Sequence, residues 1–140
     1  MTNQGIDIPH AKMRGEWAEL RFMSRAAEHG LRVAKPWGDS SPYDFAVEHH
    51  GHFLRVQVKC TKYRRWNSYR CCVAANGVPY ASDQLDFIAA YVIPADTWYI
   101  IPTAAILGQQ TILLTPDRKY DRKHCKFDGY KEAWHLLRAE

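Results

Sequence analysis

The chain has 140 residues, a formal net charge of +4 and 46% hydrophobic residues. That length and apolar content suffice for one hydrophobic core, so we expect a single domain over residues 1–140. No run of about 20 apolar residues occurs, and the N-terminus lacks the apolar stretch of a secretory signal. We therefore expect a cytoplasmic protein without a membrane partner.

The four cysteines form no CxxC pair and show no spacing typical of a zinc site; they are Cys60, Cys71, Cys72 and Cys125. Free thiols are favoured over a metal site.

The first predicted element is a helix over residues 9–29, with Pro9 in its first turn and Gly30 ending it. At about 100° per residue, one apolar arc contains Met13, Trp17, Leu20, Met23 and Ala27. Glu16 interrupts the middle of this arc and Glu19 its edge. A carboxylate turned toward a core is costly unless it is paired or binds a metal, so both roles stay open.

Residues 31–35 predict a short strand, and the turn residues of 36–42 predict a loop. Asp39 in this loop is interpreted as a turn acceptor rather than as a ligand.

Two alternating segments, residues 44–49 and 52–59, predict a hairpin around a His50-Gly51 turn. One face carries the apolar side chains Phe45, Val47, Leu54, Val56 and Val58. Counting back along the ladder from the turn sets Asp44 opposite Gln57, and these two share the other face with Lys59.

This trio has a chemical interpretation. A carboxylate and an amide oxygen suit Mg²⁺, which takes few protein ligands. A neighbouring ammonium can orient or deprotonate an attacking water and neutralise charge on a phosphate. The alternative is an ordinary hairpin with three exposed polar residues.

From residue 49 to residue 82 the chain has no acidic residue but many basic and aromatic ones. Such a mixture suits a nucleic-acid backbone, with a solvated loop as the alternative. The candidate DNA-binding residues are Lys62, Arg64, Arg65, Trp66 and Arg70.

Further strands are predicted at residues 69–75, 85–93, 97–101 and 111–115, with a loop at 63–68 and an irregular segment at 78–84. A second basic cluster at 116–126 includes Asp117 and Asp121, which weakens a DNA role for it. Asp128 is a candidate cap for a final helix, in which Tyr130, Trp134 and Leu137 recur at helical spacing as core residues.

Pro42-Tyr43-Asp44 followed by Gln57-Val58-Lys59 resembles the PD-(D/E)xK nuclease signature. Tyr43 separates the proline from the acid, and Gln57 replaces the usual second acid. The glutamine is similar to the variant in the group I intron-associated branch, which includes homing endonucleases. Gly15-Glu16-Trp17-Ala18-Glu19 is similar to the first-helix pattern of the superfamily, in which Glu19 takes the acidic position.

The resemblance implies an α/β, restriction-endonuclease-like core with a mixed β-sheet flanked by helices. It implies a metal-dependent DNA endonuclease that is homing-endonuclease-like and works as a homo-oligomer, a dimer or a tetramer. Asp44, Gln57, Glu19 and the Val58 carbonyl would then hold Mg²⁺ or Mn²⁺, and Lys59 would position the attacking water.

The alternatives are a Holliday-junction resolvase-like nuclease, a DNA-binding module that has lost cleavage, and an oligomeric structural protein. The DNA-binding module stays open because Gln57, in place of an acid, removes one negative charge from the site.

Overall fold

The structure is a computed structural model and describes residues 2–118 and 125–138. Its centre is a five-stranded sheet in the order β1-β2-β3-β8-β9. These strands are β1 (Arg32–Ala34), β2 (Phe45–His49), β3 (His52–Thr61), β8 (Phe87–Val92) and β9 (Thr97–Pro102). β3 and β8 run parallel while the other neighbours are antiparallel, so the predicted mixed sheet is confirmed.

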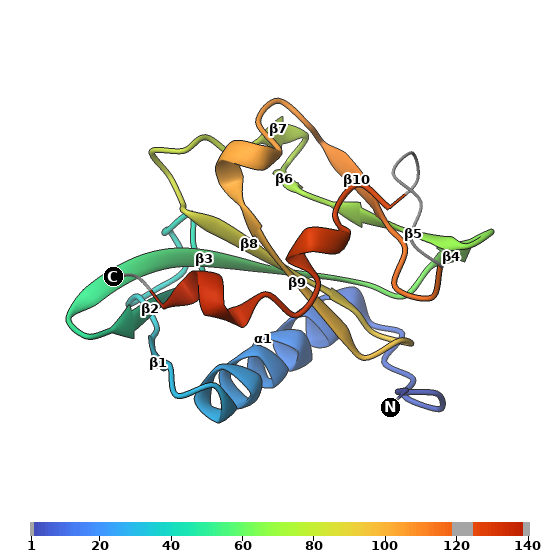
Figure 1. Cartoon of the computed structure of the whole chain (residues 1–140), viewed down its shortest axis with the longest axis horizontal. Coiled ribbons are helices and arrows are strands. Elements are labelled where there is room, and N and C mark those ends of the chain that lie inside the picture. Colours follow the sequence, from blue (N-terminus) through green and yellow to red (C-terminus); the bar gives the residue numbers. More distant parts are fainter. Residues whose placement is uncertain (1, 119–124, 139–140) are drawn as a thin grey trace.

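Helix α1 (Ala11–Glu28) lies along one face of this sheet (Figure 1). It begins after the N-cap His10, so Pro9 lies just outside it, and Gly30 follows its end with φ +75°. Its buried residues are Ala18, Phe22 and Ala26.

The predicted apolar arc of this helix was therefore wrong. Met13 and Leu20 are each 60% exposed, and Glu16 is exposed too. The buried stripe lies nearly opposite, because the small residues Ala18 and Ala26 let the helix approach the sheet while Phe22 stacks on Phe45 at 5.4 Å between ring centroids.

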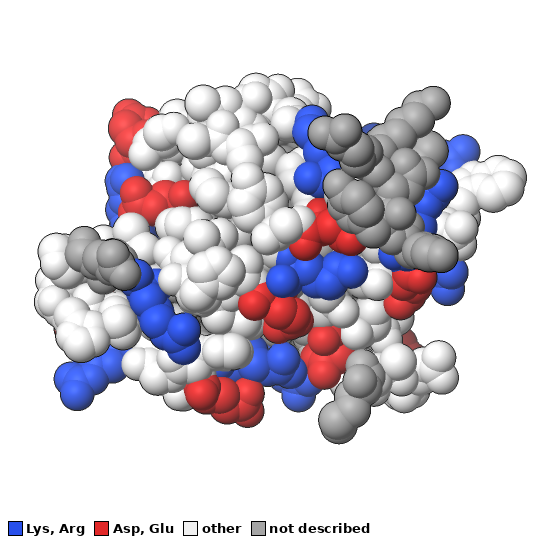
Figure 2. All heavy atoms as spheres, viewed as in Figure 1, with Lys and Arg blue, Asp and Glu red and all other residues white. Residues whose placement is uncertain are grey.

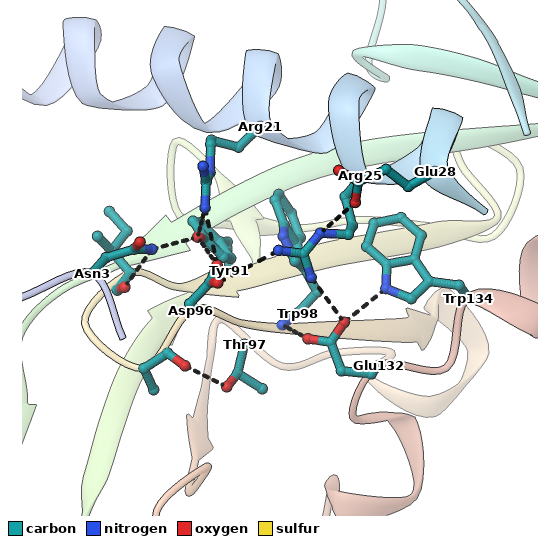
Figure 3. A network of polar contacts seen from close by, with 12 residues as sticks. Asn3, Arg21, Arg25, Glu28, Tyr91, Asp96, Thr97, Trp98, Glu132 and Trp134 are labelled. Carbon is teal, nitrogen blue, oxygen red and sulfur yellow. Dashed lines mark hydrogen bonds and ion pairs between the residues drawn. The ribbon is translucent and has the colours of Figure 1, made fainter. Parts of the chain in front are cut away.

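A polar network fixes α1 to the turn between β8 and β9 (Figure 3). Arg21 donates to Asp96 at 3.1 Å and to the Tyr91 hydroxyl at 3.2 Å, and that hydroxyl donates to Asp96. Arg25 reaches the other Asp96 oxygen at 3.5 Å. The helix that carries Glu19 is therefore held by charge as well as by apolar packing.

The opposite face of the central sheet is covered by strands rather than by a second long helix. β4 (Arg64–Arg65), β5 (Ser68–Cys72) and β10 (Thr111–Leu114) form an antiparallel sheet in the order β10-β5-β4. β6 (Ala74–Ala75) and β7 (Val78–Pro79) form a hairpin beside it. The expected loop at 63–68 and irregular segment at 78–84 thus contain the short strands β4 and β7. Each has only two residues, too few for an alternating pattern to be recognised in the sequence.

The C-terminal segment contains no α-helix within the residues described. It has two 3₁₀ turns, η2 (Asp128–Tyr130) and η3 (Trp134–Leu137), after the earlier η1 (Thr103–Ala105). The predicted final helix fails because Glu132 has φ +50° and accepts from the Trp98 amide and the Trp134 indole, each at 2.8 Å. The core role of Trp134 and Leu137 is confirmed, since both are buried.

Part of the second basic cluster, residues 119–124, lies outside the described residues. Across 2–118 and 125–138, no helix is long and apolar enough to cross a membrane. All four cysteines lie within the described residues, and no disulfide joins any of them.

Candidate active site

The hairpin of β2 and β3 has the predicted register. His50 and Gly51 form its turn with φ of +53° and +82°, and His49 pairs with His52. Positive φ at both central residues gives the turn the twist that the flanking strands need. The ladder runs back to Phe45 opposite Val56, which sets Asp44 one step beyond, where its amide donates to the Val56 carbonyl at 2.9 Å.

Asp44 and Gln57 line one cavity of about 450 Å³. Both side chains are half-buried, on the face of the hairpin away from Phe45 and Val56. One Asp44 oxygen, Oδ2, accepts the Val58 amide at 2.8 Å, which fixes the carboxylate against β3. Backbone N–H and C=O groups of one residue point to the same side of an antiparallel ladder, so the Val58 carbonyl also faces the side on which β2 has ended.

Lys59 is held at the same end of the hairpin. Its ammonium donates to the Ala74 carbonyl at 3.3 Å and lies 5.5 Å from the centre of the Tyr80 ring. Tyr80 is buried and lines the cavity of Asp44 and Gln57. An ammonium has three donors, so this contact leaves Lys59 able to bind a further acceptor.

Glu19, on α1, lies near Asp44 and forms an ion pair with Lys35. Its Oε1 accepts the Lys35 ammonium at 2.8 Å, and its side chain is 26% exposed. Glu19, Lys35, Asp39 and Asp44 line a second cavity of about 190 Å³, so Asp44 borders both hollows. Of the two helix acids, Glu19 and not Glu16 lies beside Asp44.

The surroundings of Asp44 disfavour its negative charge. Burial raises the pKa of this carboxyl, and the charge of Glu19 raises it further, against the Val58 amide and the ammonium groups of Lys35 and Lys59, which lower it. A cation bound beside Asp44 and Glu19 would relieve both the burial and the repulsion.

The donor set fits a hard cation that keeps several waters. It offers two carboxylates and one amide oxygen, from Asp44, Glu19 and Gln57. Among the described residues, no group of three or more His, Cys, Asp or Glu side chains is placed to hold a metal ion. Few protein ligands are typical of Mg²⁺, whereas a closed structural zinc site would need four.

The candidate DNA-binding residues differ in exposure and in the contacts that their side chains already make. Arg64 donates to the Trp66 carbonyl at 2.9 Å and to Asn67, so its guanidinium holds the β4–β5 turn. Arg65 and Arg70 are exposed, and Trp66 is 86% exposed. The Lys62 ammonium lies 5.5 Å from the Tyr63 ring centre.

Sequence reasoning missed Lys35 and Tyr80. Lys35 was assigned to the end of a predicted strand, directly before the loop that leads to Asp44, whereas β1 ends at Ala34. Tyr80 lies far along the chain in a segment without a periodic pattern, and only the folding of β6 and β7 brings it under Lys59. Asp39, interpreted as a turn acceptor, lines both cavities.

A mixed sheet with a helix on one face and an acid–glutamine–lysine hairpin is the arrangement expected of a restriction-endonuclease-like nuclease. The chain belongs to the PD-(D/E)XK endonuclease family, whose sequence profile matches residues 9–137. The family resemblance read from the hairpin motif is thereby confirmed.

A solved structure is similar over almost the whole chain. It is that of a bacterial homing endonuclease, I-Ssp6803I, with 29% sequence identity and a TM-score of 0.77, covering 94% of this chain and 93% of that one. A search of curated proteins finds no match.

Proposed function

We propose that this protein is a divalent-metal-dependent DNA endonuclease of the homing-endonuclease type, acting as one nuclease domain. The observation that carries the proposal is that Asp44 and Gln57, from paired strands, line one cavity beside the ammonium of Lys59. Membership of an endonuclease family and the similarity to I-Ssp6803I support it.

Asp44, Gln57 and Glu19, with the Val58 carbonyl, would hold Mg²⁺ or Mn²⁺. The bound ion would polarise the scissile phosphate and stabilise the leaving oxygen. The Asp44 carboxylate is already held in position, because one of its oxygens, Oδ2, accepts the Val58 amide at 2.8 Å. Glu19 uses Oε1 for Lys35 and has Oε2 for a further partner.

Lys59 orients the attacking water and neutralises charge that develops on the phosphate. The Ala74 carbonyl and the Tyr80 ring hold its ammonium in place, so little side-chain freedom is lost when substrate binds. Lys35 lies beside Asp44 and adds a second positive charge, which favours approach of a phosphate.

DNA would lie along the basic segment that contains Lys62, Arg64, Arg65, Trp66 and Arg70. At the end of the molecule that carries β4 and β5, Lys and Arg atoms are prominent on the surface (Figure 2). A homo-oligomer, a dimer or a tetramer, would bring two such sites to the two strands of a duplex.

The test is cleavage of plasmid, linear duplex and four-way junction in parallel, with Mg²⁺, with Mn²⁺ and with EDTA. Because the target is unknown, the duplex is first enriched from a random pool by binding in EDTA. We expect metal-dependent cleavage of the enriched duplex. Exclusive cleavage of the junction would instead indicate a resolvase-like nuclease.

A second candidate is a DNA-binding module that has lost cleavage. Gln57 favours it, because a neutral amide in place of an acid weakens metal binding, and the described residues include no cluster of three acidic or other metal-binding side chains. Tight duplex binding with no cleavage in either metal would support this candidate and contradict the nuclease.

A further inference from the structure

The small sheet of β10, β5 and β4 has one buried and one exposed face. Tyr69, Cys71, Ile112 and Leu114 are buried and face the central sheet. The alternate residues of β5 and β10 are exposed: Arg70, Cys72, Thr111 and Leu113. Arg70 pairs directly with Leu113 in the ladder, so a charged and an apolar side chain lie side by side on the outer face.

This outer face is hollowed. Arg65, Trp66, Ser68 and Arg70 line a hollow of about 530 Å³ together with Thr111 and Leu113. A second hollow of about 320 Å³ shares Ser68, Thr111 and Leu113 and is bounded by Arg118 and Lys126. No acidic residue lines either hollow in the part of the chain that the structure describes.

Two of these arginines are available to a ligand. Among the described residues, no hydrogen bond or ion pair engages the side chains of Arg65 and Arg70, in contrast to Arg64, which is used by its own turn. Leu113 is 57% exposed between polar neighbours. A surface made only for phosphates would gain nothing from an exposed leucine at its centre.

The dimensions match the major groove of duplex DNA. That groove is about 12 Å wide and admits a two-stranded β-ribbon. Over most of its length the small sheet consists of β5 paired with β10, because β4 adds only Arg64 and Arg65 beside β5. Residues two apart on a strand lie about 6.8 Å apart, close to the length of two base-pair steps. Thr111 and Leu113, which are two apart on β10, would thus face bases about two steps apart, and Arg70 lies beside Leu113 across the ladder.

We propose that the outer face of β5 and β10 reads base edges in the major groove and so determines the sequence preference of this protein. Arg70 donates to the acceptors of a guanine, Leu113 contacts a thymine methyl group, and Thr111 and Ser68 bond to adjacent bases. The inference rests on the proposed action on DNA, but it concerns recognition and not cleavage. Lys62 and the β4–β5 turn would then contact the backbone, which positions the duplex without reading its sequence.

The test is selection of bound duplexes from a random pool in EDTA, followed by sequencing, for the wild type and for Arg70→Ala and Leu113→Ala. The controls are Arg32→Ala on β1 and Leu20→Ala on α1, which remove the same exposed side chains elsewhere. We expect the wild type to select a consensus, and Arg70→Ala to lose the preference for guanine at one position, by about 5- to 150-fold. Leu113→Ala should weaken a thymine preference at a neighbouring position. The two controls should select the wild-type consensus.

Three results would overturn the inference. One is a wild type that selects no consensus. Another is an Arg70→Ala variant that binds all sequences more weakly by the same factor, as loss of a phosphate contact would give. The third is a Leu113→Ala variant that changes the oligomeric state in sedimentation while keeping the consensus, which would make this face a contact between copies.

Cleavage of the selected duplex in Mg²⁺ separates this inference from the proposed function. If nothing is cut but the consensus still depends on Arg70, recognition stands and the nuclease proposal fails. If the duplex is cut and the consensus is unchanged in Arg70→Ala and Leu113→Ala, the nuclease stands and this inference fails. Thermal unfolding of each variant confirms that it is folded, and Arg70→Lys serves as a milder replacement.

Discussion

Asp44 joins the three parts of the candidate site. It lies directly before β2, accepts the Val58 amide of β3, and is close enough to Glu19 on α1 for the two charges to interact. Glu19 rather than Glu16 lies beside Asp44, which agrees with the choice of Glu19 made from the family resemblance.

Glu19→Gln should impair cleavage of the enriched duplex far more than Glu16→Gln. Only Glu19 lines a cavity with Asp44, while Glu16 is exposed. Single-turnover cleavage rates of the two variants, with metal titrations, provide the comparison. A near-normal Glu19→Gln beside an inactive Glu16→Gln would reverse the assignment.

The raised pKa of Asp44, caused first by burial and then by Glu19, has a measurable sign. The folded state holds the Asp44 proton to higher pH than the unfolded state does, so ionising Asp44 costs stability. The free energy of unfolding should therefore fall as the pH rises from the ordinary aspartate pKa, near 3.9, through the raised value. Asp44→Asn should remove this fall in urea titrations at stepped pH. A carboxyl ¹³C titration that places Asp44 at or below the ordinary value would contradict this prediction.

At the scale of elements, the position of α1 depends on the turn between β8 and β9. The Asp96 side chain is 12% exposed and receives charge-assisted bonds from Arg21 and Arg25 (Figure 3). Glu28, 64% exposed, pairs with the same Arg25 at the surface. Asp96 and Glu28 therefore allow a matched comparison, since a mostly buried acid and an exposed acid bind the same arginine.

Asp96→Asn should lower the free energy of unfolding by roughly 1–3 kcal/mol, because it leaves partly buried donors without a charged acceptor. Glu28→Gln should change it by about 0.5 kcal/mol or less, as for exposed pairs. Urea denaturation at neutral pH measures both. Equal effects would mean that the network does not fix the helix.

The pH dependence of this contribution has the opposite sign to that of Asp44. Burial raises the pKa of Asp96, but the bonds from Tyr91 and Arg21 and the charges of Arg25 and Arg21 outweigh it and hold the pKa below its usual range. The stability from Asp96 is thus fully present above the ordinary aspartate pKa and is lost as the pH falls through the lowered value. The difference between wild type and Asp96→Asn should shrink in strong acid.

The hairpin that carries the site was predictable because its information is local. A two-residue period, a turn containing glycine and a fixed count along the ladder determine which side chains share a face, and the structure has that register. The face of α1 was not predictable in this way, since Ala18 and Ala26 carry little hydrophobic signal and are buried because the helix packs closely on the sheet.

At the scale of the whole molecule, the unpredictable features depend on contacts between distant segments. β5 pairs with β10, some forty residues later, and so forms a second sheet that no local pattern indicates. Lys59 meets Tyr80, and Glu19 meets Lys35, only after folding. The shared position of Asp44, Gln57 and Lys59 at one end of the hairpin was therefore predicted. The contacts that Tyr80 and Lys35 make with Lys59 and Glu19 were not.

Charge over the whole molecule should govern binding to DNA that lacks the preferred sequence. Lys62→Ala should weaken binding equally for all such sequences and reduce the slope of log affinity against log salt by about 0.9, as loss of one phosphate contact does. Lys12→Ala, exposed on α1, should leave the slope unchanged. An unchanged slope in Lys62→Ala would remove this residue from the backbone contacts.

The most direct test of the central claim is single-turnover cleavage by wild type and Asp44→Ala on the enriched duplex in Mg²⁺. Asp44 lies at the edge of two cavities, so its removal should leave the fold intact, as thermal unfolding would verify. We predict that Asp44→Ala binds the duplex at least as tightly as the wild type, because one negative charge facing the phosphate is gone, and that it does not cleave it. Cleavage by folded Asp44→Ala at the wild-type rate would contradict the account.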